Sequence, residues 1–178
     1  VTMPYTVCDA LFRSAKYRSY YQRVARDDQA PMPPSEHRHR GTVDEMLFPA
    51  YRDVICFAAL SPDKRGVGRY GDIAVTWRVD PGYLGRRISL LEMDSYDFYE
   101  HHNLAYAEVP QGHRATWDDR SKLAVEKLAV KVRPGQSNDD LNRLFFWPEN
   151  DEFIEVAIYA EEGIVIDDAI HVQQLRSP

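Results

Sequence analysis

The stretch FIEVAIY, residues 153–159, says most about the fold of this chain. Ile154, Val156 and Ile158 alternate with the residues between them, and a period of two is typical of a β-strand. The alternation predicts one apolar face that packs into a core. Glu155 lies in mid-strand on the opposite face. Two interpretations stay open: a strand residue that faces water on a one-sided sheet, or a functional carboxylate whose burial is costly.

Three other stretches predict strands. DIAVTWRV (72–79) has the same alternation, and DVICFAAL (53–60) is the kind of continuous apolar run found in strands buried on both faces. RRISLLE (86–92) follows the turn DPGYLG and predicts a shorter strand. After residue 160, EEGIVIDDAIHV predicts a turn, a few extended residues and a short helical turn near Asp167.

The remaining periodic segments predict helices. Residues 8–27 have apolar side chains at near-helical spacing, which predicts one N-terminal helix. Residues 28–41 contain three prolines and polar neighbours, which favours a loop. Residues 117–132 predict a helix capped by one of their two aspartates, and Ser137 is placed to cap a second short helix.

Length and composition indicate a single domain spanning residues 1–178. The chain has 178 residues, 44% of them hydrophobic and 28% charged, which is typical of a globular protein with one core. The pattern of elements predicts an α+β fold with an N-terminal helix, mainly antiparallel sheets and short helices.

Charge and cysteine content restrict the class of protein. The formal net charge of −6 disfavours general nucleic-acid binding, because proteins that follow a phosphate backbone carry a basic excess. No apolar run approaches the roughly 18 residues of a membrane span, and no signal peptide is visible, so no membrane partner is expected. With only two cysteines, Cys8 and Cys56, a reducing compartment such as the cytoplasm is favoured.

No standard metal or phosphate motif is present in the sequence. Five of the six histidines occur as HRH (37–39), HH (101–102) and the single His113, without a CxxC or HExxH pattern, so we predict no metal site. The turn RGVGRYG (65–71) is rich in glycine but leads into a strand instead of a helix, which does not match a phosphate-binding loop.

Three segments together resemble toxin-type ADP-ribosyltransferase-like domains of bacteria: residues 69–79 (RYGDIAVTWRV), 86–96 (RRISLLEMDSY) and 152–172 (EFIEVAIYAEEGIVIDDAIHV). The resemblance covers about the C-terminal two-thirds of the chain. It implies two split antiparallel sheets with NAD, as substrate, in the cleft between them. The implied activity is ADP-ribosyl transfer or NAD hydrolysis by a cytoplasmic or delivered effector, whose acceptor the residues do not identify.

The resemblance also implies roles for individual side chains. Glu155 would be the catalytic carboxylate, which stabilises the positive charge that develops on the ribose as nicotinamide leaves. The glycine-rich turn would let the backbone approach the ligand closely. Arg13, Arg52 and Arg69 all compete as the residue that anchors the nicotinamide. The implied cofactor-binding residues are Arg69, for the phosphates, Tyr70 and Tyr159, for stacking with Phe153 as an alternative, and Ser89 and Ser95, as polar walls of the cleft.

Two other classes of function stay open. The acidic balance and the 11 tyrosines also suit a non-catalytic module that binds a protein partner, including a degenerate copy of the same fold. The carboxylates Asp72, Asp94 and Glu155 could instead serve a hydrolase or nuclease.

Overall fold

The computed structural model of the chain describes residues 1–61, 64, 66–78, 80, 82, 85–105, 108–147, 152–165 and 169–175. It mixes helices with antiparallel strands, which confirms the predicted α+β class. In chain order the elements are β1 (Thr2–Met3), α1 (Tyr5–Ser14), β2 (Lys16–Tyr17), α2 (Tyr20–Ala25), α3 (Pro34–Leu47), η1 (Arg52–Val54), β3 (Ile55–Ala59), η2 (Gly68–Tyr70), β4 (Ile73–Trp77), η3 (Gly85–Arg87), β5 (Ile88–Leu91), α4 (Ser95–His101), β6 (Arg114–Thr116), α5 (Arg120–Ala129), α6 (Asn138–Phe145), β7 (Glu155–Tyr159), β8 (Ile164–Val165) and β9 (Ala169–Gln174).

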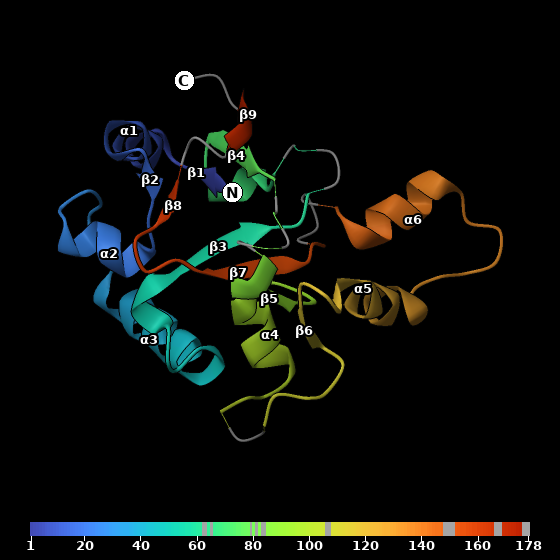
Figure 1. Cartoon of the computed structure of the whole chain (residues 1–178). Helices are drawn as coiled ribbons and strands as arrows, with labels where there is room; N and C mark the ends of the chain where they lie inside the picture. Colours follow the sequence, from blue (N-terminus) through green and yellow to red (C-terminus); the bar gives the residue numbers. More distant parts are fainter. Residues whose placement is uncertain are drawn as a thin grey trace.

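The described strands form separate antiparallel sheets. A four-stranded sheet has the order β3-β7-β5-β6, a three-stranded sheet has the order β1-β4-β9, and β2 pairs with β8. Figure 1 shows the three-stranded sheet at a distance from the four-stranded sheet in the centre of the molecule. Within the larger sheet β7 is an inner strand between β3 and β5, whereas β3 has a free edge.

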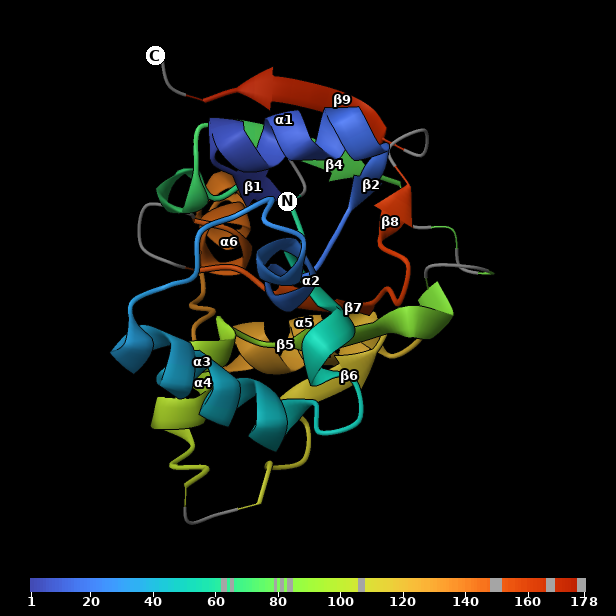
Figure 2. The same cartoon turned by 90° about the vertical axis from the view of Figure 1, so that its left-hand side faces the viewer.

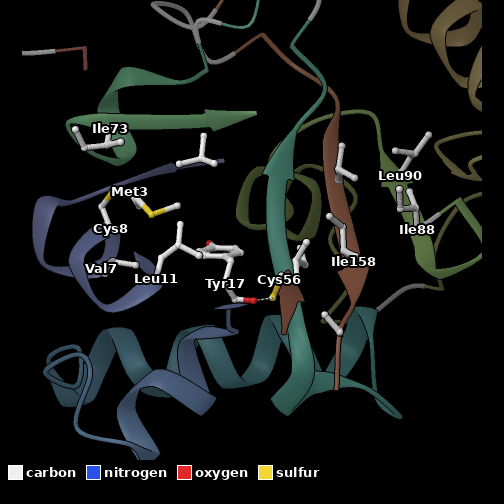
Figure 3. Packing of buried hydrophobic residues seen from close by; sticks show 14 of the residues in the cluster. Met3, Val7, Cys8, Leu11, Tyr17, Cys56, Ile73, Ile88, Leu90 and Ile158 are labelled. Carbon is white, nitrogen blue, oxygen red and sulfur yellow. Dashed lines mark hydrogen bonds between the residues drawn. The ribbon is translucent and has the colours of Figure 1, made fainter. Parts of the chain in front are cut away.

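The main hydrophobic core fills the space between the two larger sheets. Figure 3 shows Met3 and Ile73 from the three-stranded side, the α1 residues beside them, and Ile158 with its neighbours from the four-stranded side. Ile154, Val156 and Ile158 all belong to this cluster, as their alternation predicts. Burial of this apolar surface is the dominant favourable contribution to folding.

The two cysteines are free and buried. The thiol of Cys56 donates to the backbone oxygen of Tyr17 at 3.7 Å, and Figure 3 shows this contact between β3 and β2. Burial raises the pKa of Cys56 to about 12, so the thiol is protonated and inert at neutral pH.

Helices α3 and α4 cover the other face of the four-stranded sheet. They lie together on one side of β5 and β7 in Figure 2, where a second cluster joins Val43, Leu47, Phe98 and Ala157. The sheet is therefore covered on both faces, and β7 is buried from Glu155 to Ile158. The interpretation of Glu155 as a side chain that faces water is wrong.

The predicted single helix over residues 8–27 is wrong. Helix α1 ends because Ala15 adopts a left-handed conformation with φ of 54°, and the chain then pairs in β2 with β8. A new helix, α2, begins after Ser19, whose side chain accepts from the Gln22 backbone while the Gln22 side chain accepts from the Ser19 backbone. The Ser-x-x-Gln pattern is the local signal of this start.

The predicted loop over residues 28–41 is also wrong in its second half, where helix α3 begins at Pro34. A proline at the first helical position loses no hydrogen bond, because that N–H has no helical partner in any case. Pro33 is extended, as expected for a residue before proline, with Glu36 in the first helical turn. This helix carries the histidines and arginines of the HRHR segment, including Arg40.

The glycine-rich turn packs against the N-terminal strand. At Gly71, where φ is +155°, an added Cβ would lie 2.1 Å from the carbonyl carbon of Met3. At Gly66, with φ of +68°, it would lie 2.5 Å from the side-chain oxygen of Thr2. The close backbone approach expected toward a ligand is therefore, at both positions, an approach to β1.

Most other local predictions are confirmed. Ser137 caps α6 in a reciprocal pair with Asp140, and Leu123 of α5 faces the core. Asp119 occupies the N-cap position of α5, but its side chain forms no capping hydrogen bond, so the predicted aspartate cap is wrong. Strands β3, β4, β5 and β7 lie inside the four predicted segments. Most of the predicted helical turn near Asp167 lies outside the described residues, and residues 169–174 form β9.

Candidate functional site

A cavity of about 280 Å³ lies beside the free-edge strand β3. All five residues of β3 line it, together with Thr2 and Met3 of β1 and the end of the glycine-rich turn. Its charged lining residues among those described are Arg23, Arg40, Asp94 and Glu155.

Glu155 is held in this cavity by its position in β7. Its backbone pairs with Ala59 on one side and Leu91 on the other, and its side chain is only 5% exposed. The hydroxyl of Ser95 donates to Oε2 at a long 3.4 Å, while Oε1 is buried with no hydrogen-bond partner among the described residues. A buried carboxylate oxygen without a donor is uncommon, and Asp44 Oδ1 is a second one among the described residues.

The surroundings of Glu155 disfavour its charge. Burial raises its pKa well above the ordinary value, and the neighbouring Asp94 carboxylate raises it further. Arg40 and the backbone and side-chain N–H and O–H groups of Ser95 act in the opposite direction but do not cancel the effect. A cation bound beside Glu155 would lower this pKa again and favour the ionised carboxylate.

Asp94 anchors a second group of site residues. The Tyr70 hydroxyl donates to Asp94 Oδ2 at 2.5 Å and accepts from the Arg69 guanidinium at 2.6 Å. The other oxygen, Oδ1, accepts from the Tyr96 backbone at 2.9 Å and caps α4. Burial and the Asp94 charge raise the pKa of Tyr70, so its hydroxyl remains a donor. This network joins the glycine-rich turn to the start of α4.

Arg40 supplies a buried positive charge from α3. Its side chain is 13% exposed, and its Nε donates to Asp44 Oδ2 at 2.8 Å. The guanidinium carbon lies 4.1 Å from the centre of the Phe57 ring, a cation–π contact. Burial alone would lower the pKa of Arg40, but Asp44 and Glu155 outweigh that effect and raise it. The cation is therefore permanent.

Arg40 is a residue of the candidate site that the sequence pattern does not identify. The three prolines nearby dominate the local pattern and predict a loop at this position. Two signals point to the helix: Pro34 at its first position and the Arg40–Asp44 spacing of four residues, which places both side chains on one helical face. None of the three arginines considered as anchors, Arg13, Arg52 and Arg69, lines the cavity.

The structure brings three of the predicted cofactor-binding residues to Glu155. Tyr70 lines the cavity, Arg69 is bonded to Tyr70, and Ser95 is bonded to Glu155. Ser95 does not cap α4; it is the first helical residue, fully buried, and Asp94 is the cap. Phe153 also lines the cavity, with its ring edge-on to that of Tyr70 at 6.3 Å between centres.

Ser89 and Tyr159 lie elsewhere. They share a face of the sheet with Glu155, but the hydrophobic cluster over Ala157 separates them from it. Both line a second, shallower hollow of about 870 Å³, where Ser89 accepts from Arg114 at 2.8 Å. The charged lining residues there are Arg86, Arg87, Arg114, Lys122 and Asp119.

Of the three carboxylates proposed for a hydrolase, the structure brings two together. Asp94 and Glu155 line the same cavity, whereas Asp72 precedes β4 and is not among its lining residues.

Comparison of the chain with protein-family models, with curated proteins and with solved structures finds no match. None of the helices in the described part of the chain has the length and apolar character that a membrane crossing requires.

Proposed function

We propose that this protein cleaves NAD at the bond between nicotinamide and ribose and transfers ADP-ribose to an acceptor. The observation that carries the proposal is the buried Glu155 carboxylate, whose Oε1 has no donor among the described residues and which faces a cavity with Tyr70 and Phe153 at its wall. The resemblance to ADP-ribosyltransferase-like domains supports the same activity.

In this reaction the electron pair of the C1′–N bond returns to the nicotinamide ring, which leaves as a neutral molecule. C1′ of the ribose becomes an oxocarbenium-like cation, and the acceptor attacks it and loses a proton. Glu155 would lie beside this cation. A fixed carboxylate stabilises the developing charge more than it stabilises the ground state, which is the condition for catalysis.

The electrostatics of the cavity favour a cationic ligand. Because burial and Asp94 penalise ionised Glu155, a positive ring next to it recovers part of that free energy. The nicotinamide ring of NAD carries such a charge, whereas the product nicotinamide does not. The site would therefore bind the substrate more tightly than the leaving group.

The size of the cavity restricts which part of NAD is enclosed. Pockets that hold whole drug-sized ligands span roughly 300–1,000 Å³, and this cavity measures about 280 Å³. It would enclose the nicotinamide–ribose end and leave the adenylate half outside. Arg69, whose side chain is 45% exposed at the edge of the site, would meet the phosphates there.

A second candidate function has its own supporting observation. Asp94 and Glu155 are two buried carboxylates in one cavity, and a carboxyl group with a raised pKa beside an ionised partner is the arrangement of glycoside hydrolases. We expect such an enzyme to release the phenol from aryl glycosides and to leave NAD intact.

The test follows release of nicotinamide from NAD labelled in its nicotinamide ring. We expect release by the wild-type chain and a loss of about 100–1,000-fold in Glu155→Gln, the range found when one stabilising group of a transition state is removed. The control is Glu162→Gln, because the Glu162 side chain is 85% exposed and forms only a surface pair with Lys16.

Two results would refute the proposal. One is full activity in Glu155→Gln, which would remove the role of this carboxylate. The other is no release by the wild-type chain together with no thermal shift on adding NAD, which would favour a non-catalytic binding module.

A further inference from the structure

Three side chains of metal-binding type meet where β5 ends, beside the start of β6 and the C-terminal end of α4. Oε1 of Glu92 lies 3.1 Å from Nε2 of His102 and 2.8 Å from Nδ1 of His113. One ligand atom from each of the three residues lies within 4.8 Å of the other two. Glu92, His102 and His113 are 10 and 11 positions apart in the sequence. This spacing is no local metal-binding motif, and the three side chains come together only in the folded chain.

The backbone fixes all three positions. Glu92 follows β5, and its N–H donates to the backbone oxygen of His113 just before β6. His102 caps the C-terminal end of α4, with its N–H on Phe98 and its ring 4.5 Å from the Phe98 ring. Phe98 is fully buried. The three ligand-type groups are therefore held in place without a ligand, which lowers the entropy lost on binding one.

One ring nitrogen of the cluster has no hydrogen bond, although a carboxylate oxygen lies close to it. Nδ1 of His113 is buried and, in the described part of the chain, has no hydrogen-bond partner, although Glu92 Oε1 is only 2.8 Å away. At that distance the missing bond indicates that the oxygen lies off the axis of the ring nitrogen, which is the relation expected of two ligands of one metal ion. The same oxygen is hydrogen-bonded to His102 Nε2 at 3.1 Å, and a bound metal ion would replace that bond.

The donor set selects the kind of ion. Two imidazole nitrogens and one carboxylate oxygen suit Zn²⁺ and related first-row ions, whereas Mg²⁺ and Ca²⁺ prefer oxygen ligands. Zn²⁺ binds such atoms at about 2.0–2.2 Å, which places tetrahedral ligands about 3.3 Å apart. The observed separations from Glu92 are slightly shorter, so small outward rotations of the side chains would admit the ion.

We infer that Glu92, His102 and His113 bind one Zn²⁺ ion, with a water molecule in the fourth position. The water would lie on the His113 side, since that side chain is 31% exposed while those of Glu92 and His102 are 10% and 12% exposed. The ion would fasten the end of α4 to β5 and to the segment before β6. This site does not depend on the proposed reaction with NAD.

A positive charge next to the cluster is already balanced. Lys127 Nζ donates to the backbone oxygen of Glu92 at 2.7 Å and pairs with Glu152 Oε2 at 3.0 Å. The lysine therefore holds the backbone of one ligand, and Glu152 offsets its charge.

The experiment uses the full chain without a polyhistidine tag, stripped of metal with a chelator and then titrated with ZnCl₂. We expect one Zn²⁺ per chain by calorimetry and elemental analysis, and visible bands of four-coordinate Co²⁺ when CoCl₂ replaces zinc. His102→Gln and His113→Gln should each weaken zinc binding by more than about 100-fold, since loss of outer partners alone costs 10–100-fold.

The matched control is His101→Gln. Its ring lies 4.8 Å from that of His102 but belongs to an exposed residue outside the cluster, so zinc binding should be unchanged. Circular dichroism checks that each variant is folded. Because the His113 side chain is more exposed than that of His102, we expect substitution of His113 to disturb the fold less. Absence of bound zinc in the wild-type chain, or equal zinc binding in His113→Gln and wild type, would overturn the inference.

Discussion

Two buried carboxylates beside helix α4 lie in opposite surroundings. Glu155, near the N-terminal end of the helix, is 5% exposed and has a second carboxylate, Asp94, as a neighbour. Glu92, which follows β5 two residues before Asp94, is 8% exposed but its side chain lies between two imidazoles, one of them from His102 at the C-terminal end of the helix. Two carboxylates that are about equally buried therefore differ in the groups that surround them. A neighbouring carboxylate disfavours the charge of Glu155, whereas the two imidazoles beside Glu92 are groups that could bind a cation together with it.

The comparison also concerns stability. Glu155 has an oxygen with no partner among the described residues and a disfavoured charge, and both destabilise the folded chain. Active sites commonly contain such destabilising groups. The buried ion pair between Arg40 and Asp44, in the same region, stabilises the folded chain.

The largest effect is expected from Arg40→Met. It would leave Asp44, whose side chain is 1% exposed, without its ion-pair partner and with the Tyr21 hydroxyl at 3.3 Å as its donor, and breaking a buried pair typically destabilises by about 3–5 kcal/mol. Urea unfolding measures the change. Arg52→Met is the control, because Arg52 is 40% exposed and its ion pairs are on the surface, worth about 1 kcal/mol or less.

A double variant identifies the cause. If the loss comes from the charge left behind, Arg40→Met combined with Asp44→Leu should recover much of it. Equal instability in the single and double variants would instead mean that the lost packing on Phe57 is responsible.

Glu155→Gln should raise the melting temperature at neutral pH. The folded state raises the pKa of Glu155, so ionisation destabilises the fold increasingly as pH rises from the ordinary carboxyl value toward the folded value. The uncharged amide avoids this penalty, and each kcal/mol gained adds about 2–4 °C for a chain of this size. Melts compared at about pH 4 and pH 7.5 measure it.

The gain should disappear at the acidic pH, where Glu155 is protonated in both states. Asp94, Arg40 and Ser95 are the groups that set the pKa of Glu155. A destabilised Glu155→Gln at neutral pH would show that the carboxylate is well solvated or paired, and the contrast with Glu92 would be lost.

Tyr70→Phe should have a smaller effect. It removes the donor to Asp94 Oδ2, but Asp94 keeps the Tyr96 N–H and has Arg69 at 3.9 Å. We expect a loss of about 1 kcal/mol, the typical value of one hydrogen bond. Chemical denaturation measures the loss, and Tyr5→Phe, at a residue 40% exposed on α1, is the control. An unchanged stability would mean that Arg69 replaces the donor.

The smallest expected effect is the coupling between Glu155 and His113, on either side of the residues that lead into α4. Leu91 pairs with Glu155 on one side and with Arg114, next to His113, on the other, so two strand spacings, or about 10 Å, separate the two positions. Changes at that separation usually add within about 0.5 kcal/mol. The stability changes of Glu155→Gln and His113→Gln should therefore sum in the double variant, and a larger deviation would show that strain is transmitted between the two sites.

The sequence determined the strands and part of the site. The alternation at residues 72–79 and 153–159 indicates which side chains enter the core. It depends only on the geometry of a single strand, and not on how the sheets are arranged. It also singled out Glu155, because an acid between apolar strand residues is unusual. The serine cap of α6 was equally local.

Only the tertiary structure decided what surrounds Glu155 and Glu92. The break after α1 depends on pairing of Lys16–Tyr17 with β8, about 150 residues later, and no local pattern encodes such a partner. Arg40 and Glu155 line one cavity although they are more than 100 residues apart, and His102 meets His113 only because the chain folds back from α4 to β6. Long-range contacts determine burial and neighbouring charge, and those two quantities set the chemistry of a carboxylate.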